Sequence, residues 1–548
     1  FFGQNDGEIK VDELKYDSRR MNELYYEKGY LDAEVKEPFM NIDFASNQAT
    51  LDFFIKEGQK YKTKDIKIYL DSSIVDPKFI YPELELIIGN TFNIKKLRKD
   101  QAYIKEQVAN QGYAFAQVKF DIQKDEKNGT VNIIFNVIPG EKVYINDVKI
   151  AGNSRTLDRV IRRNVYLAPG DLFNFTDFKD SRSKLKRTGY FEDVKLEQKR
   201  ISKDKVDIIV NVVETSTGAI TLGGGYGSAD KLMVSASLSD KNVFGSGIGV
   251  GINVDLSARE NKFSISATNP AINDSEYTGR FEIHNTETEI NRSDYELDKT
   301  AKGFSVSVGK NFLRDLNAGL RYRFDKMDEN YTYKDSSKEG NPAYFQDTEY
   351  YTSSITPYLT VNTTDDFYFP REGYITKTSI EYAGVGGDSK YIKTSSSFKY
   401  FYSFEDLTEL DWIFRFKTQV KVLGDMGQTN PGDSLYLGGV RSLRGFKSYA
   451  FGPNNDEGLK EDPYKRMWAN SIEMNFPLIP TSKMRWGVFY DYGMIGKDDF
   501  DDIQRSSTGA LFQWLSPVGP LQFIFAQPID DKPGDDTASF EFSLGASF

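Results

Sequence analysis

Residues 412–422 read WIFRFKTQVKV, with apolar and polar side chains in alternation. One face of a strand built from them carries Trp412, Phe414, Phe416, Val420 and Val422, and the other carries Arg415, Lys417, Gln419 and Lys421. A period of two is typical of a strand whose two faces meet different surroundings. The charged face suits water, and the apolar face suits lipid or a packed core. The stretch therefore predicts a strand of a barrel or of a layered all-β protein.

The same alternation continues from about residue 215 to the C-terminus, as GIGVGINVDLSA (247–258) illustrates. About sixteen such segments, of roughly 8 to 12 residues each, follow one another between residues 219 and 548. The longer polar connections alternate in order with the short ones; the long ones lie near 286–301, 327–351, 423–466 and 493–507, and the short ones include 311–314 and 516–519. An even strand number with long loops on one side is typical of an outer-membrane barrel. We expect an all-β transmembrane barrel of about 16 antiparallel strands.

The composition agrees with a barrel and leaves one soluble alternative. The 548 residues are 39% hydrophobic and 14% aromatic, and the mean hydropathy is -0.53. No run reaches the roughly 18 apolar residues that a spanning helix requires. Barrel strands have low mean hydropathy because half of their residues face water. A soluble sandwich or propeller is the alternative, but soluble sheets rarely expose this much aromatic surface at strand ends.

Three related units precede the barrel region. Gly-Tyr pairs at 29–30, 112–113 and 189–190 each follow a helical segment and precede two strands, and we expect each glycine to end its helix in the left-handed conformation. A complete unit reads β-α-α-β-β, a small α+β domain. The predicted boundaries are a partial unit at 1–58, complete units at 59–140 and 141–215, and the barrel at 216–548. The opening residues lack the basic and apolar regions of a signal peptide, so we expect the sequence to begin within a longer precursor.

Several functional classes fit the sequence poorly. The net charge of -11 argues against nucleic acid as a partner, because phosphate binding needs a basic stripe. With no cysteine there are no thiolate metal sites and no cysteine nucleophiles. The single histidine, His284, lies in the polar stretch HNTETE without convergent partner groups nearby in sequence. We therefore expect no enzyme activity, no metal and no cofactor.

Five segments resemble one known family. LGGVRSLRGF (437–446) is similar to the signature loop of the superfamily of POTRA-plus-barrel outer-membrane insertases and translocases, and residues 141–174 and 185–196 resemble its last POTRA domain. Residues 516–529 and 540–548 resemble its two final barrel strands. The resemblance implies that the chain folds and inserts other β-barrel proteins into the bacterial outer membrane, without ATP or a cofactor. It also implies POTRA domains in the periplasm, unfolded barrel clients, periplasmic accessory lipoproteins and outer-membrane lipid as partners.

The resemblance and the alternation together give a first candidate site inside the lumen. The loop motif comprises Val440, Arg441, Arg444, Gly445 and Phe446. In 467–479 and 485–495 the alternation turns Glu473 and Asp491 inward. Both acids match positions where the family places acidic partners of the loop arginine. We therefore expect Arg444 to bind Glu473 and Asp491 within the lumen.

The seam between the first and last strands is the second candidate site. AITLGGGYGS (219–228) contains Gly223, Gly224, Gly225 and Gly227, and the last strand contains Phe540, Phe542, Gly545 and Phe548. Glycine weakens a strand by about 0.5–1 kcal/mol relative to alanine. Gly545 matches the family's seam kink, and an opened seam would expose an edge that templates an incoming strand. The alternative is that the glycines only permit barrel curvature.

Two further functions stay open at this stage. One is a related translocase that secretes or assembles specific passengers, and the other is a passive porin with periplasmic binding modules. The match of the last POTRA domain and the final strands favours the insertase. Pro370 and Gly373, in FYFPREGY (367–374), resemble a turn of the family and are interpreted as structural.

Overall fold

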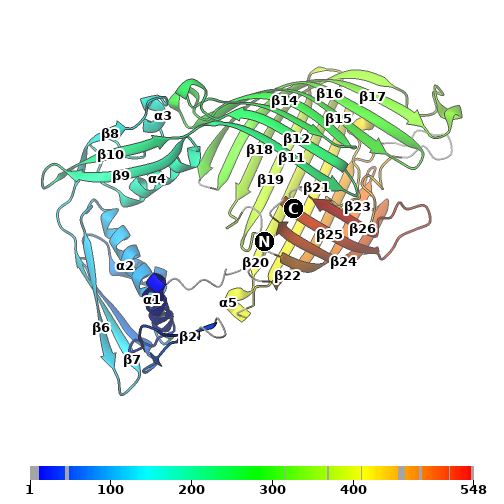
Figure 1. The fold of residues 1–548 in the computed structure, drawn as a ribbon. Coiled ribbons are helices and arrows are strands. Elements are labelled where there is room, and N and C mark those ends of the chain that lie inside the picture. Colours follow the sequence, from blue (N-terminus) through cyan, green and yellow to red (C-terminus); the bar gives the residue numbers. More distant parts are fainter. Residues whose placement is uncertain are drawn as a thin grey trace. The chain divides into compact units, whose positions relative to one another are not determined.

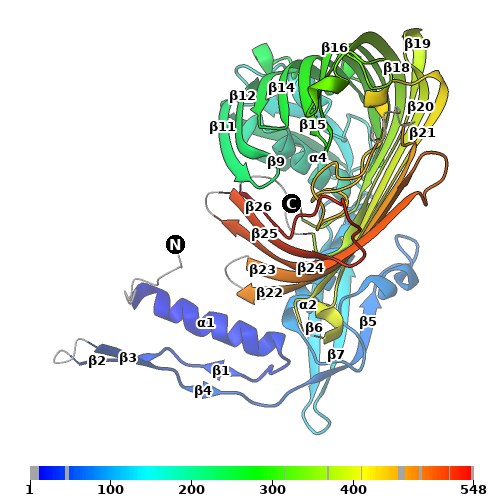
Figure 2. The ribbon, with the colours of Figure 1, turned by 90° about the vertical axis from the view of Figure 1, so that its right-hand side faces the viewer.

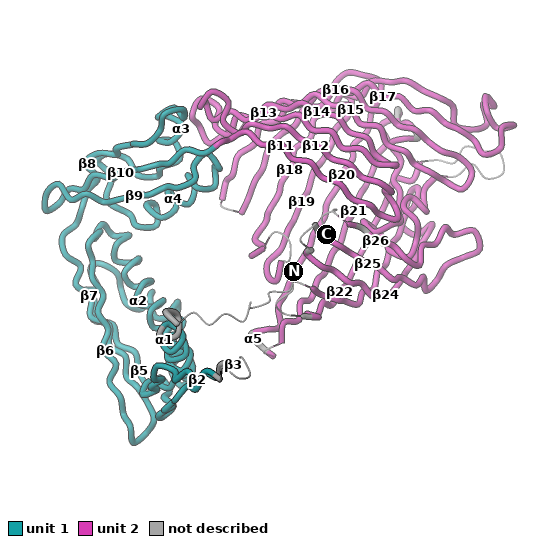
Figure 3. The backbone as a smooth tube through the Cα atoms, in the orientation of Figure 1, with its two compact units in different colours: residues 1–215 teal, residues 216–548 magenta. Residues whose placement is uncertain are grey.

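The protein forms two units, residues 1–215 and residues 216–548 (Figure 3). The structure is a computed structural model that describes residues 11–43, 48–313, 315–366, 370–408, 410–453, 463–479, 484–516 and 519–544. No helix in these ranges has both the length and the apolar character needed to cross a membrane.

The first unit contains four small sheets and their helices. Its elements are α1 (Val11–Glu27), β1 (Glu34–Val35), β2 (Phe39–Asp43), β3 (Gln48–Asp52), β4 (Ile55–Lys56), β5 (Lys62–Tyr69), α2 (Ile94–Ala109), β6 (Gln117–Asp125), β7 (Thr130–Ile138), β8 (Tyr144–Ala151), α3 (Asp158–Arg162), α4 (Phe175–Thr188), β9 (Phe191–Arg200) and β10 (Lys205–Glu214). The two three-stranded sheets have the orders β5-β7-β6 and β8-β10-β9, each with one parallel and one antiparallel pair. Each sheet has its own apolar core.

Local sequence signals set the helix ends in this unit. The side chains of Asn93 and Asn174 accept hydrogen bonds from the first turns of α2 and α4, as N-cap residues do. Gly29, Gly112 and Gly189 have φ of 92°, 94° and 70°, which is the left-handed conformation that the Gly-Tyr pairs predict.

One predicted helix takes a different form. Between β5 and α2 the chain makes two short 3₁₀ helices, η1 (Pro77–Phe79) and η2 (Tyr81–Glu83), in place of an α-helix. Each of them has a proline in its first turn. Proline lacks the N–H that a longer α-helix would require at the second of these positions. The β-α-α-β-β order is seen in full in the last unit, where α3 and α4 lie between β8 and β9.

The second unit is a closed antiparallel barrel of sixteen strands within the described residues, which confirms the predicted fold class (Figure 1). The strands are β11 (Gly218–Gly227), β12 (Lys231–Asp240), β13 (Gly249–Leu256), β14 (Glu260–Asn269), β15 (Tyr277–Asn291), β16 (Tyr295–Leu313), β17 (Leu316–Tyr333), β18 (Thr348–Asn362), β19 (Gly373–Gly387), β20 (Lys390–Ser403), β21 (Ile413–Gln428), β22 (Arg466–Ile479), β23 (Met484–Gly496), β24 (Ile503–Ser516), β25 (Gly519–Pro528) and β26 (Phe540–Leu544). Figure 2 shows β11 and β26 side by side where the ring closes.

The strands on one side of the barrel are longer than predicted. The polar connection expected near 286–301 is wrong, because β15 and β16 continue as a paired ladder to Asn291 and Tyr295 and only three residues join them. Beyond the lipid both faces of a strand meet water or other protein, so the apolar alternation fades while the backbone ladder continues. The other three long connections shorten to 334–347, 429–465 and 497–502.

Alternation along each barrel strand separates a lipid face from a lumen face. Outward residues such as Phe281, Trp486 and Tyr490 are 41% to 44% exposed and form the apolar exterior. Inward residues include buried charges such as Asp325 and Asp491. The motif residues 437–446, in the connection between β21 and β22, pack against inward residues such as Asp491.

Candidate functional site

An apolar cluster holds the motif loop against the inner wall. Its members are Leu435, Leu437, Leu443, Phe446, Phe451, Tyr464, Met467, Ala469 and Ile495, from the loop and from β22 and β23. The loop turns back through Gly438 and Gly439, whose φ of 123° and 83° favour glycine. This packing carries Arg444 into the interior, where it is only 6% exposed.

Arg444 meets both predicted acids. Its Nε donates to Asp491 Oδ2 at 2.8 Å, and its Nη2 donates to Asp491 Oδ1 at 2.7 Å, a bidentate pair. Its Nη1 donates to Glu473 Oε2 at 2.8 Å. The guanidinium lies 3.5 Å from the centroid of the Phe489 ring, so one face of the cation is covered by an aromatic side chain. The structure thus brings together the three side chains that the sequence places in one site.

Further residues complete this site and were missed by the sequence analysis. Ser471 Oγ accepts from Arg444 Nη2 at 2.7 Å, and Ser507 Oγ donates to the Arg444 carbonyl at 2.5 Å. Arg415 Nη1 donates to Glu473 Oε1 at 3.2 Å from directly across the β21–β22 ladder. Alternation already marks Arg415 as inward, but only the strand register shows what it faces. Glu473 is therefore shared by two arginines.

The motif continues into a short ladder with the segment that leads to β26. Phe446 and Thr537 form an antiparallel bridge, with Lys447 N donating to Asp536 O at 2.8 Å and Ala538 N donating to Gly445 O at 2.9 Å. Lys447 Nζ also lies 3.1 Å from Asp536 Oδ1. We call this ladder the latch. It links the loop that holds Arg444 to the last strand, which starts two residues after Ala538.

The latch is itself held to the barrel wall. Arg505 of β24 donates from Nε and Nη2 to the two carboxylate oxygens of Asp535, at 2.6 and 3.1 Å. Arg505 is only 6% exposed, and bidentate pairs of this kind fix orientation as well as distance. The segment before β26 is therefore positioned from two sides, by the motif loop and by β24.

The seam is short in the part of the chain that the structure describes. β26 pairs with β25 along 540–544, whereas its pairing with β11 is limited to Tyr226 opposite Leu544 and Gly227 opposite Ser543. Ser228 adds two bonds, because its N–H donates to Phe542 O at 3.0 Å and its Oγ accepts from Phe542 N at 3.3 Å. Residues 218–225 pair with β12 on one side but have no described ladder partner on the other. The outward side chains there, Ile220 and Leu222, are 77% and 79% exposed.

The predicted seam residues differ in what they do. A Cβ on Gly225 would lie 2.1 Å from the Leu544 carbonyl oxygen, so only glycine permits this approach of the last strand. A Cβ on Gly224 would meet nothing closer than 3.8 Å. Phe542 stacks on Tyr226 with ring centroids 5.6 Å apart, and Phe540 lies on the exterior. Gly545 and Phe548 lie outside the described residues.

We expect Gly225→Ala to open the described seam pairs, because its methyl group would displace the Leu544 backbone. The measurement is the yield of a disulfide between cysteines at 227 and 543, which lie directly opposite each other. Gly224→Ala is the matched control and should leave the yield unchanged. Equal yields in the two variants would show that the close approach at Gly225 does not govern the seam.

The remaining candidates lie elsewhere. Val440 packs on the cluster around Phe489, and Arg441 is exposed. His284 Nε2 lies 2.9 Å from Asp325 Oδ1 of β17, a partner that its sequence neighbourhood could not reveal. Gly373 has φ 96° and a Cβ there would lie 2.5 Å from the Thr363 carbonyl, in keeping with a structural turn.

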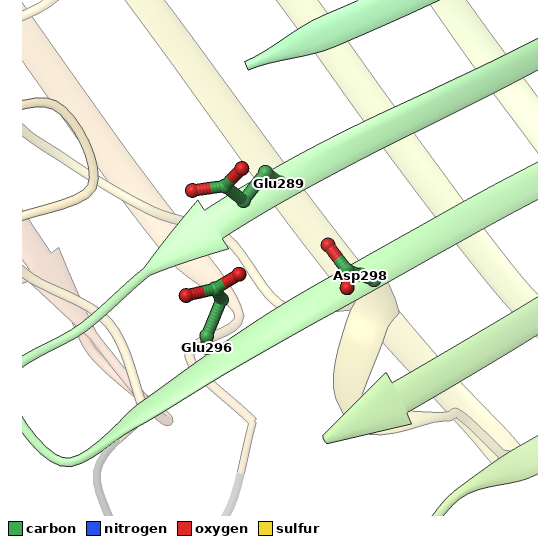
Figure 4. A group of neighbouring side chains, drawn as sticks. All are labelled: Glu289, Glu296 and Asp298. Atoms are coloured by element: carbon green, nitrogen blue, oxygen red, sulfur yellow. The ribbon is translucent and has the colours of Figure 1, made fainter. Parts of the chain in front are cut away.

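One group of acids stands apart from both sites. Glu289, Glu296 and Asp298 of β15 and β16 bring carboxylate oxygens within 4.8 Å of one another (Figure 4). Their side chains are half-buried or exposed, and exposed acidic side chains often lie close together without an ion. They contribute nothing to the contacts of Arg444.

Comparison with known proteins places these features in context. The Omp85 superfamily domain matches residues 242–548, more than half of the chain, and the surface antigen variable number repeat (POTRA) matches residues 61–140 and 143–215. The chain is 27% identical to the outer membrane protein assembly factor BamA of Nitratidesulfovibrio vulgaris, over 99% of this chain and 69% of that protein. It is 24% identical to BamA of Neisseria meningitidis, over 97% of this chain and 72% of that one.

Solved structures show the same fold. BamA from Haemophilus ducreyi lacking POTRA domains 1–3 superposes with a TM-score of 0.65 at 22% identity, covering 89% of this chain and 100% of that one. CdiB from Acinetobacter baumannii gives a TM-score of 0.51 at 13% identity, covering 98% of this chain and 100% of that one. The architecture of POTRA domains followed by a barrel is therefore shared along nearly the whole chain.

Proposed function

This chain belongs to the Omp85 superfamily, and on that premise we propose that it folds and inserts β-barrel proteins into the bacterial outer membrane. Its barrel lies in the outer membrane and its POTRA domains lie in the periplasm. The structural observation that carries the mechanism is the seam, where the described pairing of β11 with β26 is limited to Tyr226 opposite Leu544 and Gly227 opposite Ser543.

The physical task is to keep backbone groups hydrogen-bonded while a strand enters lipid. Each unpaired N–H or C=O in the hydrocarbon region costs several kcal/mol, which opposes insertion of a single strand. An exposed strand edge supplies those partners by β-augmentation. In our proposal a client strand pairs with β11, and no covalent chemistry, metal or cofactor is required.

The lumen site fixes the other side of the seam. Arg444 is tied to β22 and β23 through Glu473 and Asp491, and the latch ties the same loop to the segment before β26. We infer that this connection holds the start of β26 in place while β11 receives the client. A passive porin would not need a lumen loop joined to its last strand.

Partners follow from the same proposal. Unfolded outer-membrane barrels are the clients, and outer-membrane lipid is the surrounding phase. Periplasmic accessory lipoproteins would bind the first unit, whose sheets leave β5, β6, β8 and β9 as edge strands. Edge strands can accept a further strand from another chain.

Reconstitution tests the proposed function. Vesicles that contain the purified chain are mixed with a urea-unfolded barrel protein, and folded client is measured by its resistance to SDS at room temperature. We expect client folding at least about tenfold faster than in empty vesicles, which corresponds to about 1.4 kcal/mol of the barrier. Equal rates in vesicles with and without the chain would refute the proposal.

Weakening the latch should slow assembly. Ala538→Pro removes the N–H that donates to Gly445 O, so the short ladder loses one of its backbone bonds. We expect client folding to fall several-fold, while Ala538→Gly, which keeps the N–H, retains most of the rate. A disulfide between cysteines at 447 and 536 should restore the Ala538→Pro variant, because it replaces the lost bond with a covalent one. Undiminished folding by Ala538→Pro would contradict this role.

A further inference from the structure

The inner wall of the barrel carries a group of cations besides Arg415 and Arg444, which bind Glu473 and Asp491. They are Arg321 of β17, Lys377 of β19, Lys399 of β20, and Lys417 and Lys421 of β21. Their neighbours in sequence, such as Leu320, Ile380 and Tyr400, face outward and are exposed, so alternation turns these five cations toward the lumen. We call them the cationic wall.

A cavity lies against this wall. Its volume is about 290 Å³, and Arg321 and Lys377 line it together with the side chains of β18, β19 and β20. The hydroxyl residues that line it are Thr356, Tyr358, Thr360, Thr378, Ser379, Ser395, Ser396 and Ser397. Hydroxyl groups can donate hydrogen bonds, and cations attract negative charge, so the lining suits an anionic group.

Within the described residues, no carboxylate oxygen lies within 4.0 Å of any cation of the cationic wall. Glu473 and Asp491 act on Lys399 and Lys417 only over longer distances, because their close partners are Arg415 and Arg444. Lys399 and Lys417 even stand directly opposite each other across the β20–β21 ladder, where like charges destabilise a sheet. Lys417 instead reaches the backbone carbonyl of Arg441.

Charges further along the same strands are paired. Asp325 lies 2.9 Å from His284 Nε2 and 2.6 Å from Arg323 Nε. Within the described residues, Arg321 and Lys377 therefore lack a close carboxylate such as the one that Asp325 offers to Arg323 further along β17.

Arg321 and Lys377 lie near the periplasmic end of their strands. β11 follows the periplasmic POTRA domains directly, and antiparallel order puts the starts of β17 and β19 at that same end. Arg321 and Lys377 lie within five residues of those starts, and Lys399 lies four residues before the end of β20. A chain that enters the lumen from the periplasm therefore meets Arg321, Lys377 and Lys399 close to its point of entry.

We propose that the cationic wall binds carboxylate-rich segments of an unfolded polypeptide that enters from the periplasm. The size of the wall favours a peptide over a small anion. It extends from β17 to β21, four strand spacings or roughly 19 Å, which matches about six residues of extended chain. A small anion would contact one or two of the cations only. The inference rests on the proposed function, since it places this segment in a client on its way to the seam.

Peptide binding to the full chain in lipid nanodiscs tests the proposal. The probes are a fluorescent 12-residue peptide with glutamate at alternate positions and the same peptide with glutamine instead. We expect the acidic peptide to bind at least about tenfold more tightly, and this preference to shrink at high salt as exposed charges are screened. Equal affinities for the two peptides would overturn the proposal.

Charge variants locate the binding. The preference for the acidic peptide should mostly disappear in the wall variant, Arg321→Gln/Lys377→Gln/Lys399→Gln. It should remain in the control variant, Lys241→Gln/Lys302→Gln/Lys390→Gln, which removes the same charge from exposed positions. The wall variant is expected to fold, because it relieves repulsion; SDS resistance of the barrel checks this, and Lys377→Gln alone serves as the milder variant. Loss of the preference in both triple variants would show a nonspecific charge effect and overturn the proposal.

Disulfide trapping gives a second readout. A cysteine at Ser379, which lines the cavity, should capture a cysteine-bearing acidic peptide, and one at outward Ile380 should not. If sulfate displaced the glutamate and the glutamine peptides equally, the site would bind small anions only, and the proposal would be contradicted. These measurements need no client insertion. Their outcome therefore tests peptide binding separately from the insertase function that reconstitution tests.

Discussion

Oxidation of a Gly227→Cys/Ser543→Cys variant is expected to abolish client folding. These residues lie directly opposite each other at the described closure of the barrel. Opposed residues of antiparallel strands have Cα atoms about 4.5–5.5 Å apart, within the range that a disulfide spans. A covalent seam cannot release β11 to pair with a client, so the loss should approach the rate of empty vesicles.

The controls use the same background, which contains no native cysteine. Reduction of the disulfide should restore folding, which excludes damage from the substitutions. A disulfide between Thr286→Cys and Ala301→Cys, opposite residues of β15 and β16, should be harmless because that ladder is continuous. Full activity of the oxidised seam variant would mean that the seam does not open.

Arg444→Ala is expected to give the second largest effect. It removes the bidentate partner of Asp491, which is only 2% exposed, while Glu473 keeps Arg415. Stranding one member of a buried charge pair costs about 3–5 kcal/mol. We expect the loop to detach from β22 and β23. The rate of client folding should then fall at least about tenfold, which corresponds to about 1.4 kcal/mol in the activation free energy. Full activity at a normal protein level would contradict the role of Arg444.

A double variant separates stability from function. Arg444→Ala/Asp491→Ala removes the stranded carboxylate, so thermal unfolding of the barrel should recover part of the loss. Client folding should stay low, because the loop is still unattached. Lys465→Ala, a cation at the end of the same loop, is the control and should behave as the unsubstituted protein. If activity recovered with stability, the ion pairs would serve only to hold the barrel together.

The sequence predicts which way a side chain faces, because this depends on the period along one strand. It predicts few side-chain contacts between strands, because these depend on the strand register. A period of two is a property of neighbouring residues, so it turns Glu473 and Asp491 inward without knowledge of their partners. The pairing of Arg415 with Glu473 depends on the register between β21 and β22, which cannot be read from the sequence of either strand alone. The same holds for His284 and Asp325, which come from β15 and β17.

The latch and the lengths of the barrel strands are two further features that the sequence does not predict. Residues 535–538 have no periodicity, and their contact with the motif loop arises only when both connections fold over the same end of the barrel. The hairpin of β15 and β16 extends past the apolar region, where sequence pattern no longer distinguishes a strand from a polar loop. The sequence predicts that Gly225 weakens its strand, whereas the structure shows that glycine is required there by the close approach of the Leu544 backbone.

Trapping a client strand on β11 tests the central claim most directly. Single cysteines at Thr221 and Leu222 are combined with a cysteine in the last strand of a client, and disulfides are sampled while folding proceeds. We predict client disulfides at these positions and none at Ile252, an outward residue of β13 whose strand is paired on both sides. Client folding at the full rate with no disulfide to β11, or with equal trapping at Ile252, would contradict a seam that templates client strands.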